Sequence, residues 1–150
     1  MKEFVKLMID AKTENLGAVQ DFIISELEAA GCPAGMQTQI IICAEEIFVN
    51  IAHYAYNQAA NPEICGAAIY INAGDKDKDG EIIIMIEDSG VPFNPLERES
   101  PDINARTDER EIGGLGIYMV RQMMDSVEYC HKNGKNILTL KKRIKQIKAT

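Results

Sequence analysis

Two pairs of apolar stretches, each joined by a short polar segment, constrain most strongly what this chain can fold into. The first pair is Ile64 to Ala73 and Glu81 to Glu87. The second is Ser126 to His131 and Asn136 to Lys142, joined across Asn133-Gly134. An Asn-Gly dipeptide between two such runs is a strong signal for a tight β-hairpin. Strands joined by hairpins run antiparallel, so the pattern favours an antiparallel or mixed sheet over the strand–helix–strand alternation of a Rossmann fold.

Apolar residues that recur every three or four positions predict the helices. A short strand over Phe4 to Ile9 comes first, and a helix follows from the cap-like Asn15 to Gly31. The second helix is carried by Ile40 to about Tyr56, with Pro33 near its start. The chain therefore opens with one strand and two consecutive helices before the first hairpin.

A charged segment, at about residues 96–112, shows little periodicity and separates the first hairpin from a third helix at about Gly114 to Met124. A loop of this length inside a compact domain is usually functional, and we expect a lid over an active site. The whole order predicts an α+β fold: a two-layer α/β sandwich with a mixed, mostly antiparallel sheet and its helices on one face. With 150 residues, we expect a single domain over residues 1–150.

The bulk composition narrows the class of function. The net charge is -7, which argues against a nonspecific nucleic-acid binder because few cations are available to neutralise phosphates. No apolar stretch approaches the roughly 20 residues that a spanning helix needs, and the N-terminus lacks the apolar core of a signal peptide. The four cysteines have no C-x-x-C spacing, so we expect buried, reduced thiols in a cytoplasmic protein rather than a zinc or redox pair.

Polar residues recur along one edge of the second helix. Glu46 and Asn50 are four residues apart and share a face, and His53 follows three residues later. On an isolated helix such a file could simply face water. It could also carry chemistry: an amide oxygen suits magnesium, and a carboxylate one turn away could take a proton from an attacking hydroxyl. Glu45 points about 100° away from Glu46, so it is the poorer base.

Two further segments carry binding chemistry. Asp88 directly follows an apolar strand, and Gly90 beside it could permit the close approach of a flat ligand; the alternative is an ordinary Asp-Ser-Gly turn. Gly113-Gly114-Leu115-Gly116 opens the third helix, where free backbone N–H groups would favour phosphate; the alternative is a merely flexible junction. Each of the three segments alone is weak evidence for a nucleotide-binding site, whereas the three together in this order are strong evidence.

Together these segments resemble the N, G1 and G2 boxes of the Bergerat-fold ATPase superfamily, which includes gyrase and histidine kinases. The match is closest to the small bacterial anti-sigma-factor serine/threonine kinases and covers essentially the whole chain. It rests on Glu46-x-x-x-Asn50-x-x-His53, on Asp88-x-Gly90-x-x-Phe93-Asn94-Pro95, and on Gly113-Gly114-Leu115-Gly116 with Asp125 downstream. The resemblance implies binding of ATP with Mg2+ and phosphorylation of a serine on a STAS-type anti-sigma-factor antagonist. It also implies sequestration of a sigma factor, usually by a homodimer.

The same resemblance implies roles for individual residues. Glu46 would be the general base, Asn50 the magnesium ligand, and Asp88 the acceptor for the adenine amino group with Gly90 beside the base. The remaining motif positions would contact the nucleotide: His53, Phe93, Gly113, Gly114, Leu115 and Gly116, with Arg106 or Arg110 of the lid near the γ-phosphate.

One position departs from the pattern. Many relatives carry a Gly-Thr near the last strand, whose hydroxyl supports the adenine contact, whereas here Asn136 is the nearest polar residue. Because an amide can make a similar contact, we expect the asparagine to change the strength of nucleotide binding and not to abolish it.

Three readings of the function remain. The first is a protein-serine kinase, because a base and a metal ligand are both present. The second is a nucleotide-gated module that switches a partner without transferring phosphate. The third, a detached histidine-kinase catalytic domain, is disfavoured because we find no phosphoacceptor helix with a suitable histidine.

Overall fold

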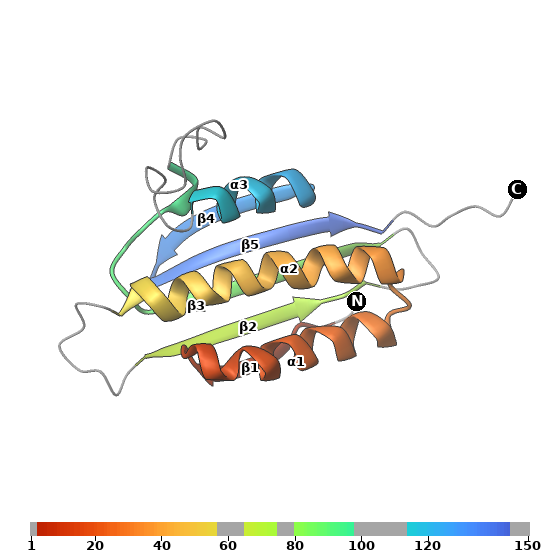
Figure 1. Ribbon diagram of the computed structural model, residues 1–150, viewed down its shortest axis with the longest axis horizontal. Coiled ribbons are helices and arrows are strands. Elements are labelled where there is room, and N and C mark those ends of the chain that lie inside the picture. Colours follow the sequence, from red (N-terminus) through yellow and green to blue (C-terminus); the bar gives the residue numbers. More distant parts are fainter. Residues whose placement is uncertain (1–2, 57–64, 75–79, 98–113, 145–150) are drawn as a thin grey trace, which may run out of the picture.

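The computed structural model describes residues 3–56, 65–74, 80–97 and 114–144, and in this part of the chain one sheet is covered by helices on one face (Figure 1). The order of elements is β1 (Val5–Asp10), η1 (Thr13–Asn15), α1 (Leu16–Ala29), α2 (Ala34–Asn50), η2 (Ile51–Ala55), β2 (Gly66–Asn72), β3 (Glu81–Asp88), η3 (Pro95–Glu97), α3 (Gly114–Met123), β4 (Ser126–Lys132) and β5 (Lys135–Arg143). This confirms the two-layer α+β fold predicted from the sequence.

The sheet has the strand order β1-β2-β3-β5-β4, and all four neighbouring pairs are antiparallel. Of the two arrangements expected, antiparallel or mixed, the described strands adopt the first. In the β3–β5 pair, Asp88 lies directly opposite Asn136. Two polar residues that are far apart in the sequence are thereby brought together at one end of the sheet.

Alternation along the strands separates the two faces of the sheet. Ile69, Ile84 and Leu140 are fully buried beneath the helices, where they join the core side chains of the helical layer, among them Ile23, Phe48 and Val120. The opposite face is only partly covered: Met8 there is 72% exposed. The helix-covered face therefore holds the core, and the functional residues lie where that layer meets the ends of the strands.

The ends of α1 and the start of α2 follow from local chemistry. Gly31 takes a positive φ of 75° directly after α1, as expected for a helix stop. Asn15 occupies the N-cap position of α1, but the expected capping bond is not made: its side-chain amide donates to the backbone oxygen of Asp10, at 3.0 Å. Pro33, with φ of -60°, precedes the first residue of α2.

α2 ends in a wider turn. After Asn50 the helix continues as a π-helix, η2, over Ile51–Ala55. A π-helical turn is rare and often marks a functional position. Here it sets the direction in which the backbone of Ala55 points, which matters for the loop after β3.

The second hairpin is confirmed. Asn133 and Gly134 both have positive φ, 55° and 76°, as a tight turn between β4 and β5 requires. Within the described residues, no helix is both long and apolar enough to cross a membrane.

The expectation of buried thiols is correct only in part. The four cysteines are free, and Cys32 and Cys43 are buried, but Cys65 is half-buried and Cys130 is exposed. Cys130 lies on β4, an edge strand on which no side chain is fully buried, whichever face of the sheet it points to.

Candidate functional site

The polar edge of α2 faces the protein rather than bulk water at Glu46. The side chain is half-buried and hydrogen-bonds the side chain of Asn50, one turn further along the helix. Burial raises the pKa of the Glu46 carboxyl, and the bond with Asn50 partly opposes that shift. A carboxylate with a raised pKa and an amide oxygen beside it suit a general base next to a metal ligand.

The neighbouring Glu45 has a different role. Its carboxylate accepts a hydrogen bond from the side-chain amide of Gln20 on α1, so it ties the two helices together. The helical turn that separates Glu45 from Glu46 thus directs Glu45 toward a partner on α1.

Glu46 lies against the start of α3. A Cβ atom at Gly116 would overlap the carboxyl group of Glu46, so a larger residue there would displace the Glu46 side chain from its position. Gly114 and Leu115, the first residues of α3, lie in the same turn. The first turn of α3 therefore lies beside the carboxyl group of Glu46.

At the end of the sheet, Asp88 is 8% exposed and its carboxylate is held by two hydrogen bonds. The backbone N–H of Gly90 donates to Oδ1 at 2.9 Å, and the side-chain amide of Asn136 donates to the same oxygen at 3.0 Å. Within the described residues, both hydrogen bonds to this carboxylate are thus accepted by Oδ1. Oδ2 is left to accept from a ligand.

Asn136, the position that departs from the family pattern, is 7% exposed and lies at the centre of this network. Besides Asp88, its amide donates to the backbone oxygen of Val91 at 3.0 Å, and its oxygen accepts from the backbone N–H of Phe93 at 3.1 Å. The hydroxyl of Tyr129 on β4 also donates to that oxygen. No sequence motif marks Tyr129, because its contact with Asn136 depends on the pairing of β4 with β5.

Gly90 is required by the protein itself. A Cβ atom there would overlap the backbone oxygen of Ala55 and lie 2.7 Å from its carbonyl carbon. The N–H of Val91 donates to the same oxygen at 3.2 Å. The sequence suggested close approach of a flat ligand, whereas the described contact is between the loop after β3 and the end of η2.

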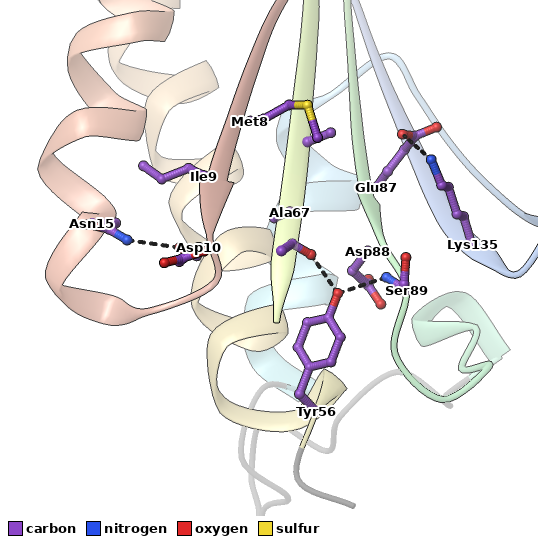
Figure 2. A pocket seen from close by; sticks show the side chains of 12 residues that line it. Met8, Ile9, Asp10, Asn15, Tyr56, Ala67, Glu87, Asp88, Ser89 and Lys135 are labelled. Carbon is purple, nitrogen blue, oxygen red and sulfur yellow. Dashed lines mark hydrogen bonds and ion pairs between the residues drawn. The ribbon is translucent and has the colours of Figure 1, made fainter. Parts of the chain in front are cut away.

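Tyr56 fixes the same loop from the other side (Figure 2). Its hydroxyl donates to the backbone oxygen of Gly66 and accepts from the N–H of Ser89, at 2.8 Å for the latter. Burial raises the pKa of this phenol, which keeps it protonated and able to donate. Sequence reasoning did not single out Tyr56, because a tyrosine at the end of a helix carries no motif.

An open pocket of about 580 Å³ lies beside Tyr56 at the ends of β1, β2 and β3. Asp88 and Ser89 line it, together with Asp10, Glu87 and Lys135, but Glu46, Asn50 and Gly116 do not. It therefore borders the candidate site without forming the whole of it.

The remaining candidates divide into three groups. His53 is exposed with its ring edge-on to Tyr54, 5.9 Å between centroids, and Phe93 is 52% exposed. Arg106, Arg110 and Gly113 lie outside the described residues. Asp125 holds the junction of α3 and β4 to β5: its carboxylate accepts from the N–H of Arg143 at 2.6 Å, and its own N–H donates to Lys141.

These residues converge from three separate segments on the N-terminus of α3 and on the end of β3. A carboxylate and an amide on one helix, a buried carboxylate at a strand end and a helix that begins with glycines are the arrangement of a nucleotide-binding domain. A family model for the histidine kinase-like ATPase domain matches residues 9–142, and the chain belongs to this family.

Among curated proteins, the chain resembles two bacterial kinases. It is 28% identical to the serine/threonine-protein kinase BtrW of Bordetella bronchiseptica, over 71% of this chain and 70% of BtrW. It is 24% identical to the serine-protein kinase RsbW of Bacillus mycoides, over 93% of this chain and 84% of RsbW.

Among solved structures, the fold resembles the RsbU and RsbW domains of Rv1364c from Mycobacterium tuberculosis. The TM-score is 0.65 at 15% sequence identity, over 95% of this chain. The matched part is 33% of that longer chain, so this likeness concerns the fold of one region of it.

Proposed function

We propose that this protein is an ATP-dependent protein-serine kinase that acts as an anti-sigma factor by phosphorylating a STAS-type antagonist. The observation that carries the proposal is the pairing of Glu46 and Asn50 on α2, with the Glu46 carboxylate packed on Gly116 at the start of α3. The kinases BtrW and RsbW, to which the chain is similar over most of its length, support the same class of reaction.

The spacing of the two ends of the site supports ATP as the phosphate donor. α2 contacts α3 through Glu46, and η2, which continues from α2, contacts the loop after β3 through Ala55, nine positions later. These two contacts connect the two ends of the proposed site through one continuous helical segment, with room between them for an extended ligand. The base would lie at Asp88 and the phosphates at Gly113, Gly114 and Gly116.

The residues present fit ATP and magnesium. Oδ2 of Asp88, on a side chain of which Oδ1 already accepts two hydrogen bonds, is an acceptor suited to the amino group of adenine, and the side-chain oxygen of Asn50 is a ligand of the kind that Mg2+ prefers. When bound, Mg2+ would neutralise charge on the phosphates.

In the reaction, the chain's own residues position the reactants and move one proton. Glu46 accepts the proton of the substrate serine hydroxyl while the serine oxygen forms a bond to the γ-phosphorus. The bond from that phosphorus to the bridging oxygen breaks, and its electron pair leaves with ADP. The N–H groups at the start of α3, together with Arg106 or Arg110 in the segment at about 96–112, would stabilise the charge on the phosphates.

Several finer points belong to the same proposal and rest on the resemblance to anti-sigma-factor kinases. They are a single domain over 1–150, a lid at about 96–112, assembly as a homodimer, binding of a sigma factor, a cytoplasmic location, and nucleotide contacts from His53, Phe93 and Leu115.

Calorimetric titration with ATP, with and without magnesium, tests the site directly. We expect magnesium-dependent binding that Asp88→Asn abolishes or weakens at least tenfold, because the variant replaces an ionised acceptor by an amide. Absence of binding to the wild-type protein would overturn the proposal.

Transfer of labelled γ-phosphate from ATP to a STAS-type antagonist tests the reaction. Glu46→Gln should abolish transfer while it preserves ATP binding. Tight, magnesium-dependent binding without any phosphoprotein would favour a nucleotide-gated binding module instead.

A further inference from the structure

We propose that Asn136 positions the nucleotide base without touching it: together with Tyr129 it holds Oδ1 of Asp88, leaves Oδ2 for the base, and so makes the site selective for a purine that carries an amino donor. This inference rests on the proposed nucleotide-binding function and goes beyond it, because it assigns the selectivity to two residues behind the carboxylate.

The hydrogen-bonding capacity of Asn136 is fully used inside the protein. A side-chain amide has two N–H donors and an oxygen with two lone pairs. The donors serve Asp88 and Val91, both at 3.0 Å, with the backbone oxygen of Gly90 a further 3.4 Å neighbour. The oxygen accepts from the N–H of Phe93 and from the hydroxyl of Tyr129. A residue this buried and this fully bonded has nothing left to offer a ligand.

The orientation of the amide is fixed by its neighbours. The N–H of Phe93 can only donate, so the amide oxygen must face it, and the amide nitrogen then faces Asp88. The Tyr129 hydroxyl donates to the same oxygen and reinforces this orientation. β4, β5 and the loop after β3 are thus joined through one side chain.

The orientation of Asn136 determines what Asp88 can recognise. Oδ1 already accepts from Gly90 and Asn136, so the ligand meets Oδ2, which as part of a carboxylate can accept but not donate. An amino group on the base satisfies this oxygen. A hydrogen atom in the same place leaves a buried carboxylate oxygen unpaired, and a carbonyl oxygen is repelled.

A threonine at position 136 could not replace these contacts. One hydroxyl has a single donor, so it could serve Asp88 or Val91 but not both. Without the second contact, the loop that carries Gly90 would be held less firmly over the base.

The test is a comparison of two nucleotides by calorimetry in the presence of magnesium: ATP, and purine riboside triphosphate, which lacks the amino group. We expect the wild-type protein to prefer ATP by about 10-fold to 100-fold, since a site built to bond a group rejects the analogue that lacks it. In Asn136→Ala the preference should fall below about threefold, and Asn136→Thr and Tyr129→Phe should give intermediate values.

Thr139→Ala is the matched control, because Thr139 lies on the same strand but is not part of this network. It should keep the wild-type preference. Thermal unfolding establishes that each variant is folded; if Asn136→Ala does not fold, Asn136→Thr and Tyr129→Phe are judged by the same ratio.

The outcomes separate this inference from the proposed function. Failure of the wild-type protein to bind either nucleotide refutes the function itself. Binding of ATP with no preference over the analogue, or variants that bind both nucleotides more weakly with an unchanged ratio, would overturn the assignment of Asn136 as the positioning residue.

Discussion

The carboxyl group of Glu46 occupies the space that a Cβ atom of residue 116 would fill. The two residues come from different helices, and their contact determines where the proposed base stands relative to the N-terminus of α3. The residue at position 116 therefore determines how closely the carboxyl group of Glu46 can approach α3.

Gly116→Ala should therefore reduce phosphotransfer far more than it reduces stability. The group in the way is the end of a flexible side chain, so Glu46 moves aside and the fold survives. A displacement of about 1 Å in a reacting group can lower kcat about 100-fold. The measurement pairs single-turnover transfer of phosphate with thermal unfolding.

Gly35→Ala serves as the control for this variant. Gly35 is helical too, but nothing lies within 4 Å of its Cβ position. It should retain full activity and gain up to about 1 kcal/mol of stability from the better helix former. A Gly116→Ala variant with undiminished kcat would show that the base does not stand where the contact places it.

Phosphotransfer by the wild-type protein should rise with pH on its acidic side, through a pKa above the ordinary value of 4.5 for a glutamate, because burial raises the pKa of Glu46. Glu46→Gln should remove this limb and lower kcat by roughly 100-fold to 10,000-fold. Glu45→Gln is the matched control: it keeps an oxygen for Gln20 and should leave the pH profile unchanged.

Glu46→Gln should also stabilise the fold at neutral pH. The folded pKa lies above the unfolded one, so the neutral form is favoured in the folded state. The associated stability is complete below the unfolded pKa and is lost as pH rises through the folded value. The variant has no charge to bury, and its advantage over wild type should grow between pH 5 and pH 8 in urea unfolding. An advantage that is the same at both pH values would contradict the cause assigned here.

Gly90→Ala should destabilise the protein by about 1–3 kcal/mol and weaken ATP binding, because the added methyl group meets the backbone of Ala55, which cannot move aside alone. Urea unfolding and calorimetry measure the two effects. Gly66→Ala, at a position where nothing lies within 4 Å, should unfold like wild type. Equal stability of the two variants would argue against the close approach of the loop and η2.

The cysteines should react with a thiol reagent in a definite order. Burial raises the pKa of Cys43 to about 11, although Lys142 opposes the shift, whereas the side chain of Cys130 is exposed to solvent and accessible to the reagent. At pH 8, Ellman's reagent should label Cys130 rapidly and Cys43 only after unfolding. Cys130→Ser should remove the fast phase; labelling of Cys43 at the same rate in native protein would contradict its burial.

The sequence predicted the elements well because their signals are local. Helical periodicity placed α1 and α3 to within two residues, and Asn133-Gly134 identified its hairpin through the backbone angles that the turn requires. Glu45 and Glu46 could be assigned to different faces of the helix because an α-helix turns by a known angle per residue.

The parts of the site that depend on pairing between distant segments could not be predicted from local sequence patterns. That Asn136 lies opposite Asp88 depends on the register of β3 and β5, and the contact with Tyr129 depends in turn on β4. The π-helical turn before Tyr56 has no sequence signal. The glycines were recognised, but the groups that fill their Cβ positions, Glu46 and Ala55, belong to another helix.

The direct pairing of Asp88 with Asn136 across β3 and β5 makes the assembly of the sheet and the formation of the base pocket a single event. If one strand slipped by a single residue, one of the two side chains would turn to the opposite face. A nucleotide that requires both would bind only molecules with correctly aligned strands. At a concentration 100-fold above its dissociation constant it would favour them by about 2.7 kcal/mol. Nucleotide binding would thus stabilise the molecules in which β3 and β5 have the correct register over those in which they do not.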